Sequence, residues 1–208
     1  MKSRSLICML AGLFLIALVG SAQATIIFSD NFNTENGGVG ALNYNGFTNW
    51  IVTDGTVDLI GNGFYDFLPG NGLYVDMDGS SSNAGIMTHN FALAAGNYTL
   101  RYNLAGNHRN SSSELVGVNV GLGSLVNATH ALNQNDPFTT FTQSFSINSL
   151  TLASLSFVGF GGDNISMLLD DIVLEHVDPV PEPGTMMLLG FGLAGLAVYG
   201  KRRMNNRA

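Results

Sequence analysis

The sequence predicts an all-β fold, a single jelly-roll-like β-sandwich, between two apolar terminal segments. Apolar and polar residues alternate along residues 98–105 and again along 116–122, which is the period-two pattern of a half-buried strand. Glycine-containing turn signals recur between such runs, as at Asp54-Gly55 and at 161–164. Short strands at this spacing, with no long helical pattern among them, favour a sandwich.

The first segment has the parts of an export signal. Two basic residues precede an apolar run at 6–19, and Ala22 and Ala24 then form a small-residue cleavage pattern. We expect signal peptidase to cut after Ala24, which makes residues 1–24 a signal peptide. The alternative is an uncleaved anchor helix.

Further strands are expected where apolar runs lie between turn signals. They are residues 26–32, 50–60, 72–77, 85–91, 138–147, 154–160 and 167–175. Together with the two alternating segments, these runs predict one β-sandwich domain over residues 25–178.

The charged residues of this body are mostly acidic. All fifteen acidic residues lie between Asp30 and Glu182, where Arg101 and Arg109 are the only Lys or Arg residues, so the net charge there is −13. Nucleic-acid binding needs a basic surface to displace counterions, so this composition argues against it. An acidic body suits life outside a membrane, or the binding of divalent cations.

The last apolar run, residues 186–199, has 14 residues and would be about 21 Å long as a helix. This is shorter than the ~30 Å hydrocarbon core unless flanking residues extend it, and we predict a transmembrane helix at about 185–200. Gly190, Gly192 and Gly195 match a dinucleotide-binding fingerprint in spacing. No strand pattern precedes them and no acidic residue follows, so we predict no nucleotide site.

The tail resembles the PEP-CTERM sorting signal of exported bacterial proteins. The matching residues are Val180, Pro181, Glu182 and Pro183 before the apolar run, and Lys201, Arg202 and Arg203 after it. The resemblance implies export across the inner membrane of a Gram-negative bacterium and recognition by a membrane-embedded exosortase. It also implies release or transfer to the cell surface, in association with exopolysaccharide or biofilm. A permanent C-terminal membrane anchor is the alternative.

The body carries a second resemblance. Residues 58–81 and 166–175 are similar to the β-sandwich domains of PEP-CTERM proteins and, more distantly, to jelly-roll carbohydrate-binding modules. In those modules an early acidic strand and an Asp pair in the closing strand often hold a structural calcium ion. The resemblance therefore implies calcium as a cofactor.

The acidic residues of the body supply the hard oxygen ligands that calcium prefers. Asp76 and Asp78 share one face at a predicted strand end. Asp30 has the strand parity of Phe32, and Asp170 has that of Leu168 and Ile172, so both would lie on apolar faces, where a carboxylate needs a cation or several donors. The calcium candidates are Asp30, Asp76, Asp78, Asp170 and Asp171; capped turns and solvated strand edges are the alternative.

Aromatic residues among amides suggest a sugar-binding surface, because a pyranose ring can pack on an exposed aromatic ring. The candidates are Tyr44, Trp50 and Tyr65, and core packing is the alternative for each. Asp170 and Asp171 are adjacent and point to opposite faces of a strand, so they cannot flank one scissile bond. We expect a non-catalytic surface or matrix protein that contacts polysaccharide; a matrix protein without a ligand and an extracellular hydrolase remain the alternatives.

Overall fold

The computed structural model describes residues 24–109, 114–120, 125–177 and 185–205. Residues Ala24–Val177 form one compact unit, which contains all the strands. The remainder of the chain groups separately, and its described part is helix α2 (Thr185–Asn205).

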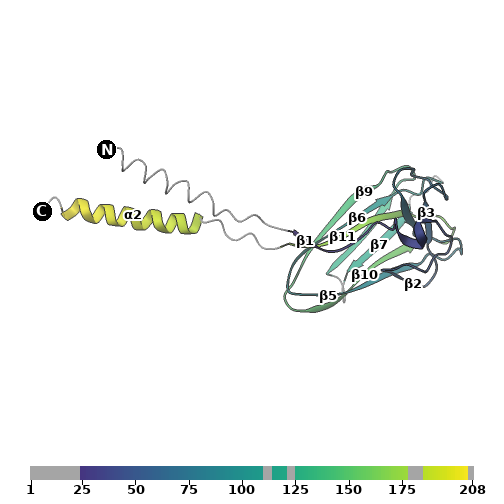
Figure 1. The fold of residues 1–208 in the computed structure, drawn as a ribbon, viewed down its shortest axis with the longest axis horizontal. Helices are drawn as coiled ribbons and strands as arrows, with labels where there is room; N and C mark the ends of the chain where they lie inside the picture. Colours follow the sequence, from purple (N-terminus) through teal and green to yellow (C-terminus); the bar gives the residue numbers. More distant parts are fainter. Residues whose placement is uncertain (1–23, 110–113, 121–124, 178–184, 206–208) are drawn as a thin grey trace. The chain divides into compact units, whose positions relative to one another are not determined.

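The first sheet, here sheet A, has the strand order β3-β4-β11-β6-β9, and β1 also pairs with β11. Its strands are β1 (Ala24–Asp30), β3 (Asp58–Gly61), β4 (Leu73–Asp76), β6 (Gly96–Ala105), β9 (Thr139–Ile147) and β11 (Leu168–Val177). All its pairings are antiparallel (Figure 1). β1 and β4 pair with different stretches of β11, at 172–177 and at 168–169.

The second sheet, sheet B, has the order β2-β5-β10-β7-β8. Its strands are β2 (Ile51–Thr53), β5 (Ile86–Leu93), β7 (Glu114–Val120), β8 (Val126–Leu132) and β10 (Thr151–Phe160). A short 3-10 turn, η1 (Glu35–Gly38), follows β1. Two antiparallel sheets with many sequence-distant neighbours confirm the predicted all-β sandwich.

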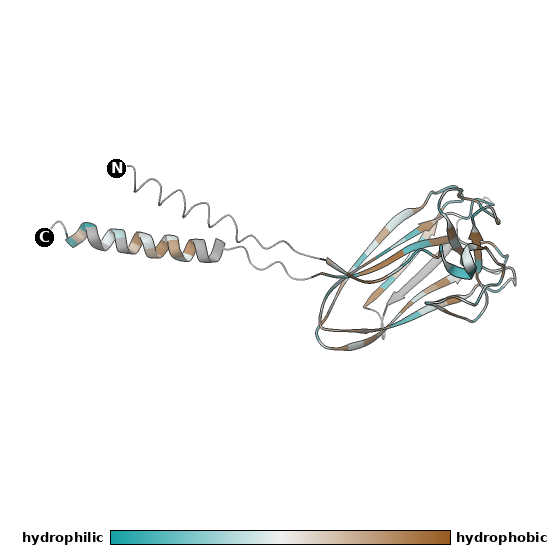
Figure 2. Cartoon of the chain, in the orientation of Figure 1, coloured by the Kyte–Doolittle hydropathy of each residue, from teal (hydrophilic) through white to brown (hydrophobic). Residues whose placement is uncertain are grey.

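The main core lies between the two sheets. Hydrophobic and hydrophilic residues alternate along several strands (Figure 2), so each sheet turns one apolar face inward. Tyr102 of sheet A packs edge-on against Phe157 of sheet B, with ring centroids 5.4 Å apart. Trp50 lies 5.7 Å from the same Phe157 ring. These aromatic contacts join the two layers.

A second, smaller cluster lies on the outer face of sheet A. Ile60 and Tyr74 belong to it, whereas their strand neighbours Leu59 and Leu73 belong to the main core. Since side chains alternate across a strand, the two clusters lie on opposite faces of the sheet. Phe64, Phe67, Leu68 and Phe138 pack on the outer cluster. This cover explains why every residue of β3 and β4 is buried.

Two strand predictions need correction. The expected strand at 50–60 is two strands in different sheets, because the chain turns at Asp54 and Gly55, both with positive φ, and β2 enters sheet B while β3 enters sheet A. Strand β8 was not predicted, although its sequence VNATHAL alternates and buries Val126. The remaining predicted runs each overlap an observed strand.

Residues predicted to form a transmembrane helix at 185–200 are indeed helical, within α2. Among the residues that the structure describes, however, no helix is both long and apolar enough to span a membrane. The predicted membrane span is therefore not supported. Its apolar run of 14 residues is interrupted by glycines and is shorter than a hydrocarbon core.

Candidate functional site

The candidate site begins with two carboxylates that face each other on sheet A. Asp58 on β3 and Asp76 on β4 are direct antiparallel partners. They have the strand parity of Ile60 and Tyr74, so they lie on the outer face, and they are only 3% and 1% exposed. Like charges placed directly opposite destabilise a strand pair, so this pair needs a cation or strong donors.

Arg109 supplies that cation. It follows β6 in the chain, and its guanidinium forms an ion pair with Asp76. Burial raises the pKa of Asp76 well above its usual range; Arg109 and the amides of Asp78 and Ser166 oppose this shift, whereas the nearby Asp58 adds to it. Both oxygens of Asp76 are thus held by donors.

Arg109 also lies over an aromatic ring. Its guanidinium carbon is 5.0 Å from the centroid of the Phe67 ring, which is the geometry of a cation–π contact. Its Nε is buried without a hydrogen-bond partner within the described part of the chain. A guanidinium carries five N–H donors, so Arg109 keeps donors beyond its contact with Asp76.

These residues border a hollow of about 80 Å³, here called the Tyr65 hollow. It is lined by Leu42, Asp58, Ile60, Tyr65, Phe67, Asp76, Ser80 and Arg109. The side chain of Tyr65 is 56% exposed, so an aromatic face is available to solvent at this hollow. Aromatic surface with a few convergent polar groups is the usual make-up of a small-ligand site.

The backbone that displays Tyr65 is unusual. Its φ is +45°, a left-handed conformation that is costly for a bulky residue. The turn around it is held by a hydrogen bond from the Gly63 amide to Asp66 Oδ2 (3.1 Å) and by the Phe64 ring, 4.9 Å from that of Tyr65. Strain that the surroundings maintain in this way is concentrated at functional sites.

Hydrogen bonds fix the walls of the hollow. The Asn43 amide donates to Asp58 Oδ1 over 2.7 Å, and the amide of Ser80 donates to the same oxygen. The Ser80 hydroxyl donates to Asp58 Oδ2 over 2.7 Å. Asp58 therefore ties two loops to β3.

The three predicted sugar contacts do not come together. Tyr65 lies at the hollow, as described. Trp50 was expected as a contact but is 3% exposed, because its indole N–H donates to Asp30 Oδ2 (2.9 Å) within the core. Tyr44 is half-buried against Phe47, and its hydroxyl donates to the carbonyl oxygen of Gly46.

The predicted calcium ligands Asp76 and Asp78 bind other groups of the protein in this structure. Asp76 binds Arg109, and Asp78 Oδ2 accepts hydrogen bonds from the backbone amides of residues 162, 163 and 164. Asp78 is fully buried and fastens the loop after β10. Neither carboxylate joins a metal cluster: across the described ranges, no group of three or more His, Cys, Asp or Glu side chains could hold a metal ion.

Asp30, Asp170 and Asp171 lie closer together. Asp30 and Asp171 line a polar hollow of about 290 Å³ with Asn31, Asn49 and other residues. Asp170 is 3% exposed; its burial raises its pKa to about 8, and the charges of Asp171 and Asp30 add to the shift. These three acidic residues thus lie near one another and apart from Asp76 and Asp78, but as described they do not form a metal-binding group either.

The predicted parity of Asp170 is wrong in part. The register of β11 against β6 shifts between Asp170 and Val173, and Asp171 has φ +48°. Leu168 therefore faces the outer cluster, whereas Ile172 faces the main core. Asp170 cannot share one face with both.

Several residues of the Tyr65 hollow were not predicted. Arg109 could have been singled out, since it is one of only two arginines in an acidic body. Phe67, two positions from Tyr65, belongs to the same aromatic-rich stretch of the sequence but was not chosen as a sugar contact. The pairing of Asp58 with Asp76 depends on strand register and gave no sequence signal.

The processing residues fall largely outside the described part. The structure does not describe Ala22, Val180, Pro181, Glu182 or Pro183. Ala24 opens β1 and is exposed. Lys201, Arg202 and Arg203 belong to α2, where Arg203 is exposed.

Comparison with solved structures gives β-rich proteins of low sequence identity. The K3 cleaved adhesin domain of Lys-gingipain from Porphyromonas gingivalis is 16% identical with a TM-score of 0.49, over 74% of this chain and 99% of that one. The CBM22-1–GH10 modules of Clostridium thermocellum endo-1,4-β-D-xylanase 10B, complexed with xylohexaose, are 13% identical with a TM-score of 0.46, over 73% of this chain and 28% of that one. The N-terminal cellulose-binding domain of Cellulomonas fimi β-1,4-glucanase C is 20% identical with a TM-score of 0.43, over 63% and 90%.

Comparison by sequence concerns the tail. No curated protein matches the chain. Residues 179–203 match the family described as the PEP-CTERM protein-sorting motif, and they include the Pro-Glu-Pro segment, the apolar run and the basic cluster noted above. The chain therefore carries a PEP-CTERM protein-sorting motif, the signal of a protein exported toward the cell surface or beyond it.

Proposed function

We propose that the protein is delivered to the cell surface or extracellular matrix by its sorting motif and there binds polysaccharide without catalysis. The proposed binding site is the Tyr65 hollow. The observation that carries the proposal is the strained, exposed Tyr65, which lines one hollow with the partly exposed guanidinium of Arg109. Exosortase and signal peptidase are the proposed processing partners.

The chemistry of the hollow suits a sugar ring. The C–H face of a pyranose is apolar and packs on an aromatic ring, while its hydroxyls need donors and acceptors at the ring edge. Tyr65 offers the ring, Arg109 the donors and Asp58 the acceptor oxygens. The hollow of about 80 Å³ admits one edge of a sugar, with the rest of the ring resting on Tyr65 outside.

The charge of the hollow favours a neutral sugar over an acidic one. Two acidic side chains, Asp58 and Asp76, line it with a single guanidinium, so acidic side chains outnumber basic ones there. A uronate carboxylate placed there would be repelled by the remaining negative charge. We therefore propose neutral polysaccharide as the ligand class.

The same carboxylates support a binding role over hydrolysis. Glycoside hydrolysis by two carboxyl groups needs one that donates a proton to the leaving oxygen. Asp76 has one oxygen on Arg109 and the other accepting two backbone amides, so neither oxygen is free to approach a leaving oxygen. Asp58 is likewise committed to Asn43 and Ser80.

Calcium is a second part of the proposal, and it concerns Asp30, Asp170 and Asp171. Calcium takes six to eight oxygen ligands, and a carboxylate that has to ionise inside the protein is stabilised by such a cation. Asp170 fits, since it is buried and accepts only the amide of Asp171 among the described residues. Backbone carbonyls and water would complete the ligand set; calcium would hold the bulged part of β11 beside the end of β1.

The test uses the secreted mature protein on an array of neutral and acidic glycans. We expect saturable binding to neutral glycans, unchanged in Tyr65→Phe and reduced in Tyr65→Ala, because the phenyl ring alone provides the stacking surface. Absence of any binder would favour a structural matrix protein without a ligand. Release of shorter sugars by the wild type would favour a hydrolase.

A further inference from the structure

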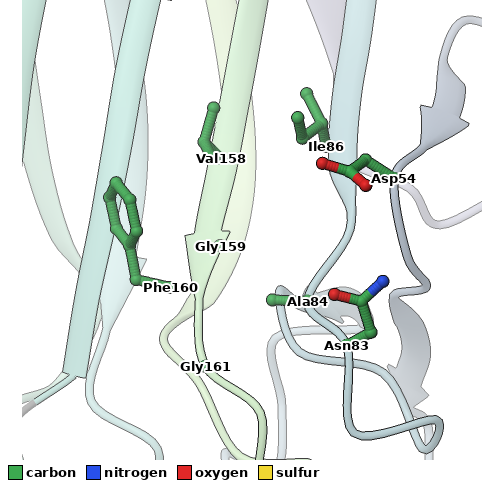
Figure 3. A pocket seen from close by; sticks show the side chains of 8 residues that line it. All are labelled: Asp54, Asn83, Ala84, Ile86, Val158, Gly159, Phe160 and Gly161. Atoms are coloured by element: carbon green, nitrogen blue, oxygen red, sulfur yellow. The ribbon is translucent and has the colours of Figure 1, made fainter.

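A second hollow lies over the outer face of sheet B, and Figure 3 shows the side chains that line it. It measures about 460 Å³, and we call it the Phe160 hollow. Its lining includes Asp54, Asn83, Ile86, Val158 and Phe160. None of these residues lines the Tyr65 hollow.

Strand alternation places an apolar floor in this hollow. On β10, Phe157 is fully buried in the main core, so Val158 and Phe160 face outward. Val158 pairs with Ile86 on β5, and together they form an aliphatic surface beside Phe160. The Phe160 ring is 48% exposed, although a phenylalanine at the end of a strand could have been buried beneath the adjacent loops.

Polar groups face this apolar surface. In Figure 3 the Asp54 carboxylate and the Asn83 amide lie across the hollow from the Phe160 ring. Neither side chain has a hydrogen-bond or ion-pair partner among the residues that the structure describes. Their loops are nonetheless fixed, because the Thr56 amide donates to the Asn83 carbonyl (2.9 Å) and the Gly85 amide donates to the Thr56 carbonyl (2.8 Å).

Phe160 lies between two closely packed glycines. A Cβ at Gly159 would come within 2.3 Å of the Met77 carbonyl oxygen, and one at Gly161 within 2.3 Å of Asp78 Oδ2. A side chain therefore does not fit at either neighbour of Phe160 without movement of the surrounding groups. The buried Asp78 lies beside Gly161 and also fastens the following loop.

We infer that the Phe160 hollow is a second saccharide-binding site, and that one molecule bridges two polysaccharide chains. The inference rests on the proposed function and extends it. The Tyr65 hollow opens on the outside of sheet A and the Phe160 hollow on the outside of sheet B, so the sandwich separates the two. An exposed ring with an aliphatic floor suits the apolar face of a neutral sugar, and Asp54 and Asn83 suit its hydroxyls.

The test counts binding sites on the mature secreted protein. The probe is the neutral hexasaccharide that binds best on the array, measured by isothermal titration. We expect a stoichiometry of two for the wild type, one for Tyr65→Ala, one for Phe160→Ala and no binding for the double variant. Phe160→Tyr should keep a stoichiometry of two, which separates loss of the ring from loss of the fold.

Bridging is measured separately, as the turbidity of the parent polysaccharide on mixing with protein. The wild type should cross-link the polymer, and either single variant should lose cross-linking while keeping one binding site. A stoichiometry of one that Phe160→Ala leaves unchanged would overturn the second site and leave the proposed function standing. A protein that binds no hexasaccharide would instead overturn both.

Discussion

Asp76 and Arg109 form an ion pair at the floor of the Tyr65 hollow, with the carboxylate almost completely buried and the guanidinium partly exposed. The ion pair offsets the repulsion between Asp76 and Asp58, because these two carboxylates face each other across adjacent strands. It also has a functional consequence, since it holds the guanidinium against Phe67 at the edge of the site. In the proposed function, the same arginine therefore serves both fold stability and ligand binding.

Removing Arg109 should be far more costly than removing the other arginine of the body. Arg109→Ala leaves a buried carboxylate unpaired, which we expect to lower the free energy of unfolding by about 3–5 kcal/mol at pH 7. Arg101→Ala breaks the surface pair with Glu175, in which the arginine side chain is 41% exposed, and should cost less than about 1 kcal/mol. Urea denaturation of both variants makes the comparison; equal losses would contradict the assigned role of Arg109.

Replacing Tyr65 by glycine should separate stability from binding. Glycine adopts a φ of +45° without strain, so Tyr65→Gly should raise the free energy of unfolding by up to about 1 kcal/mol. The same change removes the aromatic ring and should abolish binding at this hollow. Asn62→Gly is the matched control, because Asn62 also has positive φ (+50°) but does not line the hollow. Loss of stability in Tyr65→Gly would show that the ring serves the fold.

The stability of the sandwich should depend on pH through His130. This histidine of β8 shares a hydrogen bond of 2.8 Å with the Tyr102 hydroxyl, and its burial lowers its pKa below the ordinary value of 6.5. Below pH 6.5 the unfolded chain therefore binds more protons than the folded one, so stability from this group is complete above that pH and is lost as the pH falls toward the folded pKa. Denaturation at pH 8 and pH 5 should show a smaller pH-dependent loss in His130→Gln than in the wild type.

Calcium should stabilise the protein through Asp170. At a calcium concentration one hundred times Kd, we expect the free energy of unfolding to rise by about 2.7 kcal/mol relative to a chelator. Asp170→Asn should remove this gain while remaining as stable as the wild type in chelator at pH 7, since a carboxyl group with a pKa of about 8 is mostly neutral there. Asp163→Asn, an exposed change on the loop after β10, serves as the control. A melting temperature that calcium leaves unchanged would refute the metal proposal.

The fluorescence of Trp50 should report folding and should not change when saccharide binds. It is the single tryptophan of the chain, and it lies buried between Phe28 and Phe157. Its fluorescence should therefore shift to longer wavelength on unfolding and stay constant when sugar binds. A large change on adding sugar to the folded protein would place the ligand near the core and away from both hollows.

Much of the fold could be predicted from local pattern. Strands with one solvent-exposed face, such as β6, alternate regularly between apolar and polar residues. The inward residues of β6, Leu100, Tyr102 and Leu104, are indeed fully buried. The pattern failed where both faces of a strand are covered, because β3 and β4 then lose their polar alternation. It also could not show that the turn at Asp54 sends β2 and β3 into different sheets, which is decided by long-range pairing.

The site was less predictable than the fold. Tyr65 was singled out as an aromatic among amides, and it is exposed, whereas its role as a sugar contact stays a prediction. Trp50 has the same local composition but is drawn into the core by its size and by Asp30 as an acceptor. The partners Asp58, Asp76 and Arg109 are far apart in sequence and meet only through sheet register, so no spacing rule could have grouped them.

The proposed polysaccharide site can be tested most directly by mapping backbone amide shifts during titration with the neutral hexasaccharide, in the Phe160→Ala protein, which retains the first site alone. The account predicts saturable shifts centred on Leu42, Tyr65, Phe67 and Arg109, with the opposite face of the sandwich unchanged. Shifts centred elsewhere, or none at saturating sugar, would contradict it.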